Sequence, residues 1–192
     1  RLKNVCTTVS ICANRDDLPF VGTIVPDASP GSGPLGGIVA ALEYSTTDWN
    51  LMLAVDLPLL PVEVLHSLLS CALAEKSGVT SSASSLPPVA CVLPKLDGLP
   101  QPLCGLYHRV LAPGLREALE QGNFKVVAAL QQACDRLARS PDIESASPRI
   151  RLEMWDARAF ATAQPSAPDP SEWFLNINTP EDWQQAQQLR FR

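Results

Sequence analysis

The sequence predicts an α/β fold, in which a predominantly parallel β-sheet with an antiparallel element is covered by helices on both faces. Short β-branched or apolar segments alternate along the chain with longer segments that repeat apolar residues at helical spacing. This alternation is typical of βαβ units. A chain of 192 residues suits one well-buried core better than two full domains. We therefore expect a single domain that spans residues 1–192.

The expected strands are short, and most of them are apolar throughout, as buried strands are. The turn formers Asp97 and Gly98 lie between two of them, which predicts a hairpin or antiparallel pair. In chain order the expected strands are Val5–Cys12, Thr23–Val25, Leu51–Val55, Val89–Leu93, Leu103–Tyr107, Ile150–Trp155 and Phe174–Ile177.

The expected helices follow from apolar spacing and from helix-start residues. After Pro34, apolar residues recur at i, i+3, i+4 and i+7, which is the spacing of one helix face. Thr179 and Pro180, followed by two acids, form a strong helix start, because an N-cap hydroxyl, a first-turn proline and negative charge all favour that end. Five helices are expected. The first begins at Pro34, the next three span Pro61–Glu75, Pro113–Gln121 and Lys125–Ala138, and the last extends from Thr179 toward Phe191.

The composition excludes several classes of protein. The net charge is −5 and the basic residues are dispersed, so no nucleic-acid surface is expected. The six cysteines form no CxxC pair, which argues against a structural metal site and favours reduced thiols in the cytoplasm. No apolar run is long enough to span a bilayer. We expect a cytoplasmic protein without membrane or nucleic-acid partners.

Polar residues follow several of the predicted strands. Asn14 with Arg15, Asp27, Asp56, and the pair Asn176 and Asn178 all stand at such positions. In a parallel sheet the carboxyl ends of the strands meet at one edge, where ligands bind. The sequence therefore predicts a ligand site that these residues share.

Asp56 ends the most apolar of the strands, where desolvating a carboxylate without a partner is costly. A hard cation such as Mg²⁺, which binds through one or two carboxylates, is one solution. The other solution is a structural role, in which the Asp56 carboxylate caps the following helix or accepts a hydrogen bond from a backbone N–H.

Two further motifs allow both a structural and a functional interpretation. The glycines of Gly31–Gly37 let a backbone approach a ligand at a helix N-terminus, although glycine-rich turns are common without any ligand. Asn176 and Asn178, two apart on a strand, would share one face, or they could simply form a turn. His66 and His108 have no nucleophile at recognisable spacing, and we interpret both as surface or edge residues.

Six segments taken in order resemble the molybdenum cofactor guanylyltransferases. They are ANR at 13–15, PDASPGSGPLGGIVAAL at 26–42, DWNLMLAVDLPLL at 48–60, PLCGLY at 102–107, GNFKVVAAL at 122–130 and FLNINTPEDW at 174–183. The resemblance implies a Rossmann-like three-layer sandwich. It also implies transfer of GMP from GTP to Mo-molybdopterin with Mg²⁺ and release of pyrophosphate, alongside partner proteins of molybdenum cofactor biosynthesis.

The resemblance also implies roles for individual residues. Asp56 matches the acid that holds Mg²⁺ and the nucleotide phosphates, and Asp27 matches an acid on the guanine nucleotide. Gly33 and Gly37 match glycines that line the nucleotide site, and Cys12 stands at a nucleotide-contacting position where relatives often have Asn. On the pterin side the matching residues are Lys125, Asn176 and Asn178.

The chain departs from this family in two respects. A thiol at Cys12 cannot provide the paired donor and acceptor of an amide. The family's first strand and its phosphate-binding loop have no counterpart, and losing a single electrostatic donor typically slows a reaction ~10²–10³-fold. We therefore expect the chain by itself to be inactive. The alternatives are a related nucleotidyltransferase that uses CTP or a sugar phosphate, and a non-catalytic relative that binds a cofactor or partner.

Overall fold

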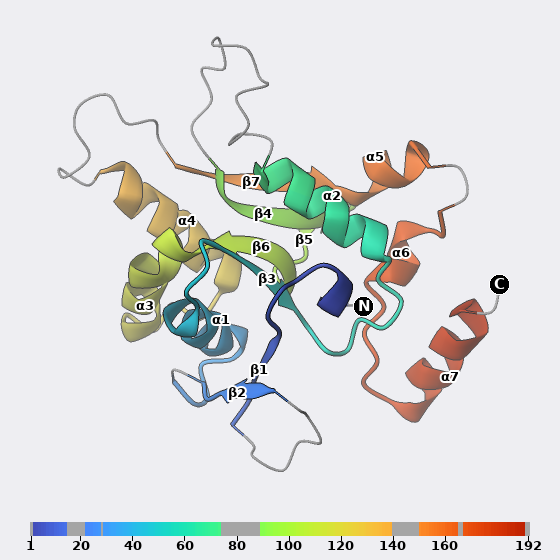
Figure 1. Cartoon of the computed structure of the whole chain (residues 1–192), viewed down its shortest axis with the longest axis horizontal. Coiled ribbons are helices and arrows are strands. Elements are labelled where there is room, and N and C mark those ends of the chain that lie inside the picture. Colours follow the sequence, from blue (N-terminus) through green and yellow to red (C-terminus); the bar gives the residue numbers. More distant parts are fainter. Residues whose placement is uncertain are drawn as a thin grey trace, which may run out of the picture.

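The computed structural model describes residues 2–14, 22–27, 29–73, 89–139, 150–164 and 167–190 (Figure 1). Helices and strands alternate along most of the chain, as the sequence predicts. The strands are β1 (Ser10–Cys12), β2 (Thr23–Val25), β3 (Trp49–Leu53), β4 (Val89–Leu96), β5 (Leu99–Pro100), β6 (Cys104–His108) and β7 (Arg151–Asp156). The α-helices are α1 (Pro34–Tyr44), α2 (Val62–Leu73), α3 (Ala112–Glu120), α4 (Val126–Ala138), α5 (Ala157–Thr162), α6 (Pro170–Trp173) and α7 (Pro180–Arg190), and 3₁₀ turns form at Leu2–Asn4 and Arg109–Leu111.

The strands form two sheets. β1 and β2 make a parallel pair. The other five make one sheet in the order β3-β6-β4-β5, with β7 also paired to β4. β6 is antiparallel to both β3 and β4, and β7 is parallel to β4, so β3, β4 and β7 run in the same direction. The mostly parallel α/β sheet with an antiparallel element is confirmed.

Helices cover both faces of the five-stranded sheet and bury two apolar clusters (Figure 1). Because side chains alternate along a strand, Cys91 and Leu93 of β4 contribute to the cluster with α1, α3 and α4, whereas Val92 contributes to the cluster with α2, α5 and α6. The apolar positions that predict α1 are buried. The arrangement is a three-layer sandwich.

The antiparallel element forms around the predicted turn. Asp97 and Gly98 have φ angles of 50° and 82°, the two positive values of a type I′ hairpin turn. The strand that pairs directly across this turn is β5, and β6 follows it and pairs with β4 further along. The expected pairing of the two longer strands is therefore confirmed, with an additional short strand between them.

Two strand predictions are wrong. Only Ser10–Cys12 of the predicted strand Val5–Cys12 is extended and paired, because the preceding residues close a 3₁₀ turn in which the amides of Val5 and Cys6 donate to the Leu2 carbonyl. The predicted strand Phe174–Ile177 is instead an irregular segment after α6. Its alternating apolar residues fit a strand, but no neighbouring strand pairs with it in the part of the chain that the structure describes.

The cysteines of the structure are unpaired, as the sequence predicts. All six cysteines are free thiols, and Cys91, Cys104 and Cys134 are buried as small apolar side chains. Burial raises the pKa of Cys104 to about 12, so this thiol is uncharged at neutral pH. No helix in the described ranges combines the length and the apolar character that crossing a membrane requires.

Candidate functional site

The parallel pair β1–β2 brings Asn14 and Asp27 together. Cys12 is the register partner of Val25, so the residues two positions beyond each strand also face one another. The Asn14 side-chain oxygen accepts a hydrogen bond of 2.8 Å from the Asp27 amide. Two of the polar strand-end features predicted from the sequence therefore meet. The Asn14 side chain thus holds the backbone of Asp27 in position.

Residues 29–33, which lead into α1, form a turn that is held by polar groups. The Ser29 amide lies 3.4 Å from Asp27 Oδ1, and the Ser32 hydroxyl donates to the Ser29 carbonyl. Ser32 is only 2% exposed. Gly33, the residue before α1, has φ +65° and ψ −155°, a conformation that is nearly restricted to glycine. The requirement for glycine at position 33 is conformational.

Gly36 is required for a different reason, which is close packing. A Cβ atom at this position would lie 2.1 Å from Asp27 Oδ1 and 2.5 Å from Ser32 Oγ. The Asp27 carboxylate therefore rests directly on the first turn of α1, where the helix dipole favours negative charge. The sequence prediction names Gly33 and Gly37 and misses Gly36. The only signal for Gly36 was its place in the glycine-rich run.

Cys12 lies against the same turn. A Cβ at Gly37 would be 3.7 Å from the Cys12 Cβ, an ordinary van der Waals distance. Partial burial, followed by the negative charge of Asp27, raises the pKa of the Cys12 thiol. The thiol is therefore uncharged at neutral pH. Four of the five predicted nucleotide-binding residues, Cys12, Asp27, Gly33 and Gly37, belong to this β1–β2–α1 corner, and the fifth, Asp56, lies after β3.

Asp56 follows β3 on the segment that leads to α2. Its Oδ1 atom is buried and has no hydrogen-bond partner among the described residues. Neither a helix cap nor a backbone N–H from the described residues, which are the structural alternatives for this side chain, occupies that oxygen. Neighbouring Val55 is 91% exposed, so the segment is open to solvent on one side. A carboxylate oxygen held away from water without a donor is suited to a cation.

The loop that carries the two asparagines is connected to Asp56. The Ile177 amide donates to the Asp56 carbonyl over 3.0 Å. Asn176 and Asn178 flank Ile177, and both are exposed. Residues two apart in an irregular segment need not share a face, so the argument for a face shared by Asn176 and Asn178 no longer applies. The segment that carries them is nevertheless bonded to Asp56 through Ile177.

The start of α7 fixes the far end of this loop. The Asp182 carboxylate accepts bonds of 3.0 and 2.9 Å from the amides of Asn178 and Thr179, and its own amide donates to the Thr179 hydroxyl. This is a capping box with Asp in place of Glu. The backbone bonds from Asn178 and Thr179 lower the pKa of Asp182. The predicted helix start at Thr179 is confirmed.

The remaining predicted residue, Lys125, immediately precedes α4 and is exposed. No hydrogen bond or ion pair between described residues joins it to Asn176 or Asn178, and none joins the Asp27 corner to Asp56. Nor does any group of three or more His, Cys, Asp or Glu side chains in these residues form a ready metal cluster. The structure thus resolves the predicted site into an Asp27 corner, an Asp56–asparagine segment, and Lys125.

The amino-terminal two thirds of the chain match a known family. Residues 1–137 match the family described as MobA-like NTP transferase domain. The chain is similar to a probable molybdenum cofactor guanylyltransferase of Flavobacterium johnsoniae, with 31% identity over 130 residues, which cover 68% of this chain and 60% of that protein. It is also similar to the molybdenum cofactor guanylyltransferase of Serratia proteamaculans, with 30% identity over 69% of this chain and 62% of that protein. The chain thus spans about 60% of the length of these relatives.

Solved structures share the fold. Molybdopterin-guanine dinucleotide biosynthesis protein A of Archaeoglobus fulgidus superposes with a TM-score of 0.60 at 24% identity, over 90% of this chain and 70% of that one. A protein of Aquifex aeolicus superposes with a TM-score of 0.62 at 19% identity, over 92% of this chain and 74% of that one. At these identities the likeness concerns the fold.

Proposed function

This chain belongs to the MobA-like NTP transferase domain family, and from that premise we propose that it transfers GMP from GTP to Mo-molybdopterin. The proposal agrees with the names of its relatives, which are molybdenum cofactor guanylyltransferases. In the reaction, a phosphate oxygen of molybdopterin forms a bond to the α-phosphorus of GTP. The bond between that phosphorus and the oxygen bridging to the β-phosphate breaks, and pyrophosphate leaves with the bonding electron pair.

The observation that carries the proposal is the buried Oδ1 of Asp56, which has no hydrogen-bond partner among the residues that the structure describes. A buried carboxylate oxygen without a donor fits a divalent cation, and Mg²⁺ typically takes only one or two protein carboxylates beside the phosphates of its substrate. Asp56 would hold the ion. Bound there, Mg²⁺ supplies positive charge that neutralises the phosphates and the departing pyrophosphate.

Asp27 has the chemistry needed to recognise guanine. A carboxylate is an acceptor-only group with two oxygens, and guanine presents an N1–H and a 2-amino group side by side as donors. Among the described residues, Asp27 Oδ1 accepts only a 3.4 Å contact from the Ser29 amide, so the carboxylate retains capacity for a ligand. Gly33 and Gly37 would line the same corner. Cytosine lacks the paired donors, which favours GTP over CTP.

The pterin substrate would bind on the side of the Asp56–asparagine segment. The exposed amides of Asn176 and Asn178 can donate to and accept from the pterin ring, and the Lys125 ammonium can contact its phosphate. The hydrogen bond from the Ile177 amide to the Asp56 carbonyl supports a pterin position next to the proposed metal site. That arrangement suits an attack by the pterin phosphate on a metal-bound nucleotide.

The test is pyrophosphate release in the presence of Mo-molybdopterin and Mg²⁺, with GTP, CTP or ATP as the donor. We expect release with GTP at least tenfold faster than with either alternative, and loss of release when Mg²⁺ is chelated. Faster release with CTP would identify a different nucleotidyltransferase. Binding of molybdopterin without release from any nucleotide would agree with the inactive chain that the sequence predicts, and it would favour a non-catalytic relative.

A further inference from the structure

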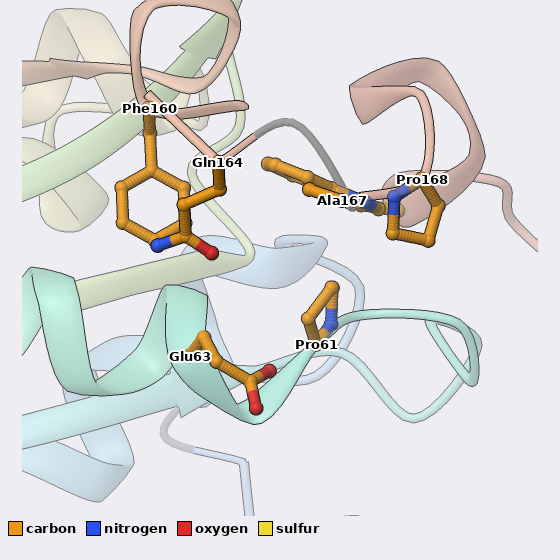
Figure 2. A pocket seen from close by; sticks show the side chains of 7 residues that line it. Pro61, Glu63, Phe160, Gln164, Ala167 and Pro168 are labelled. Atoms are coloured by element: carbon orange, nitrogen blue, oxygen red, sulfur yellow. The ribbon is translucent and has the colours of Figure 1, made fainter. Parts of the chain in front are cut away.

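A cavity outside the β1–β2–α1 corner opens between the start of α2 and the α5–α6 segment (Figure 2). Its volume is about 370 Å³, which is within the range of small-molecule sites. The walls are mainly apolar and include Pro61, Pro168 and Ala167. None of the residues assigned above to the nucleotide or the pterin lines it.

Of the described residues that line the cavity, Glu63 is the only charged one. It is exposed, and no hydrogen bond or ion pair ties it to another described residue. Figure 2 shows Glu63 on one side of the cavity, with Phe160 and Gln164 on the opposite side. A carboxylate beside apolar walls repels anions and loses hydration when a neutral ligand covers it. The charge of the cavity therefore favours a cation.

The aromatic residues of the wall pack against neighbouring rings. The rings of Phe160 and Trp173 meet edge to face, with centroids 6.2 Å apart, and Trp155 packs behind Phe160 at 4.9 Å. The Trp155 indole donates to the Ser67 hydroxyl over 3.0 Å, which fixes its position. Trp173 is only 1% exposed, and its Nε1 has no partner in the described part of the chain.

We propose that this cavity binds a small organic cation, with its ammonium group near Glu63 and its apolar body against Phe160 and Trp173. Aromatic faces combined with a nearby carboxylate attract alkylated ammonium groups, whose charge is spread over an apolar surface. The proposal does not depend on the guanylyltransferase activity, because no residue of the cavity takes part in that reaction as proposed above.

Benzyltrimethylammonium is the probe, with neutral benzyl alcohol and anionic phenylacetate as comparisons of similar apolar body. We expect calorimetry to show the cation binding at least tenfold more tightly than either comparison. Glu63→Gln should reduce the affinity for the cation by about tenfold and leave that for benzyl alcohol unchanged. Glu181→Gln, which removes the same charge from the start of α7, should change neither. Equal affinity for the three probes, or an unchanged affinity in Glu63→Gln, would overturn the proposal.

The location of binding is tested separately by the indole N–H signals in a nitrogen–proton correlation spectrum. Four tryptophans give four such signals, and Trp173→Phe identifies the one from the cavity. We expect that signal to shift during titration with benzyltrimethylammonium. If Trp173→Phe does not fold, Phe160→Leu should weaken binding of the cation instead. Shifts confined to the other tryptophans would show that the cation binds elsewhere and that the proposal is wrong.

Discussion

The backbone amide of Ile177 donates a hydrogen bond to the carbonyl oxygen of Asp56 over 3.0 Å, which joins two segments that are 121 positions apart in the numbering. This bond connects the loop between α6 and α7 to the segment that leads from β3 to α2. Asn176 and Asn178 flank Ile177, so they are the sequence neighbours of the residue bonded to Asp56, whose Oδ1 has no donor in the described part of the chain. The proposed pterin side and the proposed metal site are therefore joined through the backbone.

The substitution Asp56→Asn tests the metal role. The amide has nearly the same size but no charge, and no described residue donates to the oxygen that it replaces. We expect the urea midpoint of unfolding to stay within error of the wild type or to rise, and Mg²⁺-dependent pyrophosphate release to be abolished. Release within tenfold of the wild-type rate would remove Asp56 from this role.

Asn178→Ala tests the pterin side. The fold uses the backbone amide of Asn178, which donates to Asp182, and the substitution leaves that bond in place. We expect molybdopterin binding to weaken while the affinity for GTP and the stability stay almost unchanged. Asp182→Ala is the structural comparison, since losing a helix cap typically costs about 1 kcal/mol. Equal losses for both ligands in Asn178→Ala would indicate a purely structural amide.

Gly36→Ala tests the position of the Asp27 carboxylate. The added methyl group would meet Asp27 Oδ1 at 2.1 Å, so the carboxylate must move. We expect a stability loss of about 1–3 kcal/mol by denaturant unfolding, typical of overpacking, and a reduced preference for GTP over ATP. Gly37→Ala, whose nearest neighbour would be 3.7 Å away, should gain up to about 1 kcal/mol instead. Undiminished guanine preference in Gly36→Ala would exclude Asp27 as the acceptor for the base.

Arg158→Gln tests an ionic cross-link between the β4–β5 turn and the start of α6. The guanidinium donates two bonds of 2.9 Å to Asp97 and a third of 2.9 Å to Asp169. The bonds from Arg158 lower the pKa of Asp97, and the bonds from Ser171 followed by Arg158 lower that of Asp169. A carboxyl group whose pKa is lower in the folded state stabilises the fold at every pH above its pKa in the unfolded state, which is about 4. This stabilisation is lost as the pH falls through the pKa in the folded state.

The thermal midpoint of Arg158→Gln should therefore lie below that of the wild type from pH 7 to about pH 4, and the gap should narrow at lower pH. Arg136→Gln, which breaks a single surface pair with Glu117, should have a smaller effect at every pH. If the difference in thermal midpoint between the wild type and Arg158→Gln stays constant down to pH 2, then Asp97 and Asp169 are not responsible for that difference.

The sequence predicted elements well where the pattern is local. The apolar spacing of α1 and the capping residues of α7 are complete within a few residues of the chain, and both helices begin where the pattern indicates. The strand predicted at residues 174–177 is wrong because alternating apolar residues show only that a strand is sterically suitable. A strand also needs a neighbouring strand with free backbone groups. That neighbour is a property of the whole fold.

The site was predictable to the extent that it follows the strand ends. Parallel pairing of β1 and β2 explains why Asn14 and Asp27 meet. The need for glycine at position 36 arises from a carboxylate nine residues earlier that folds back on the helix, and no local pattern encodes that approach. The contact of Ile177 with Asp56 is equally non-local.

The separation of β1 and β2 from the larger sheet has a consequence for amide hydrogen exchange. The pair holds few buried side chains, with Val25 the only residue of either strand that is fully buried, and its main packing partner is α1. Such a unit can open without unfolding the core. The amides of this pair should thus exchange at a lower opening free energy than those of β4. Ligand binding at Asp27 would register as slower exchange there, while the rates in β4 stay unchanged.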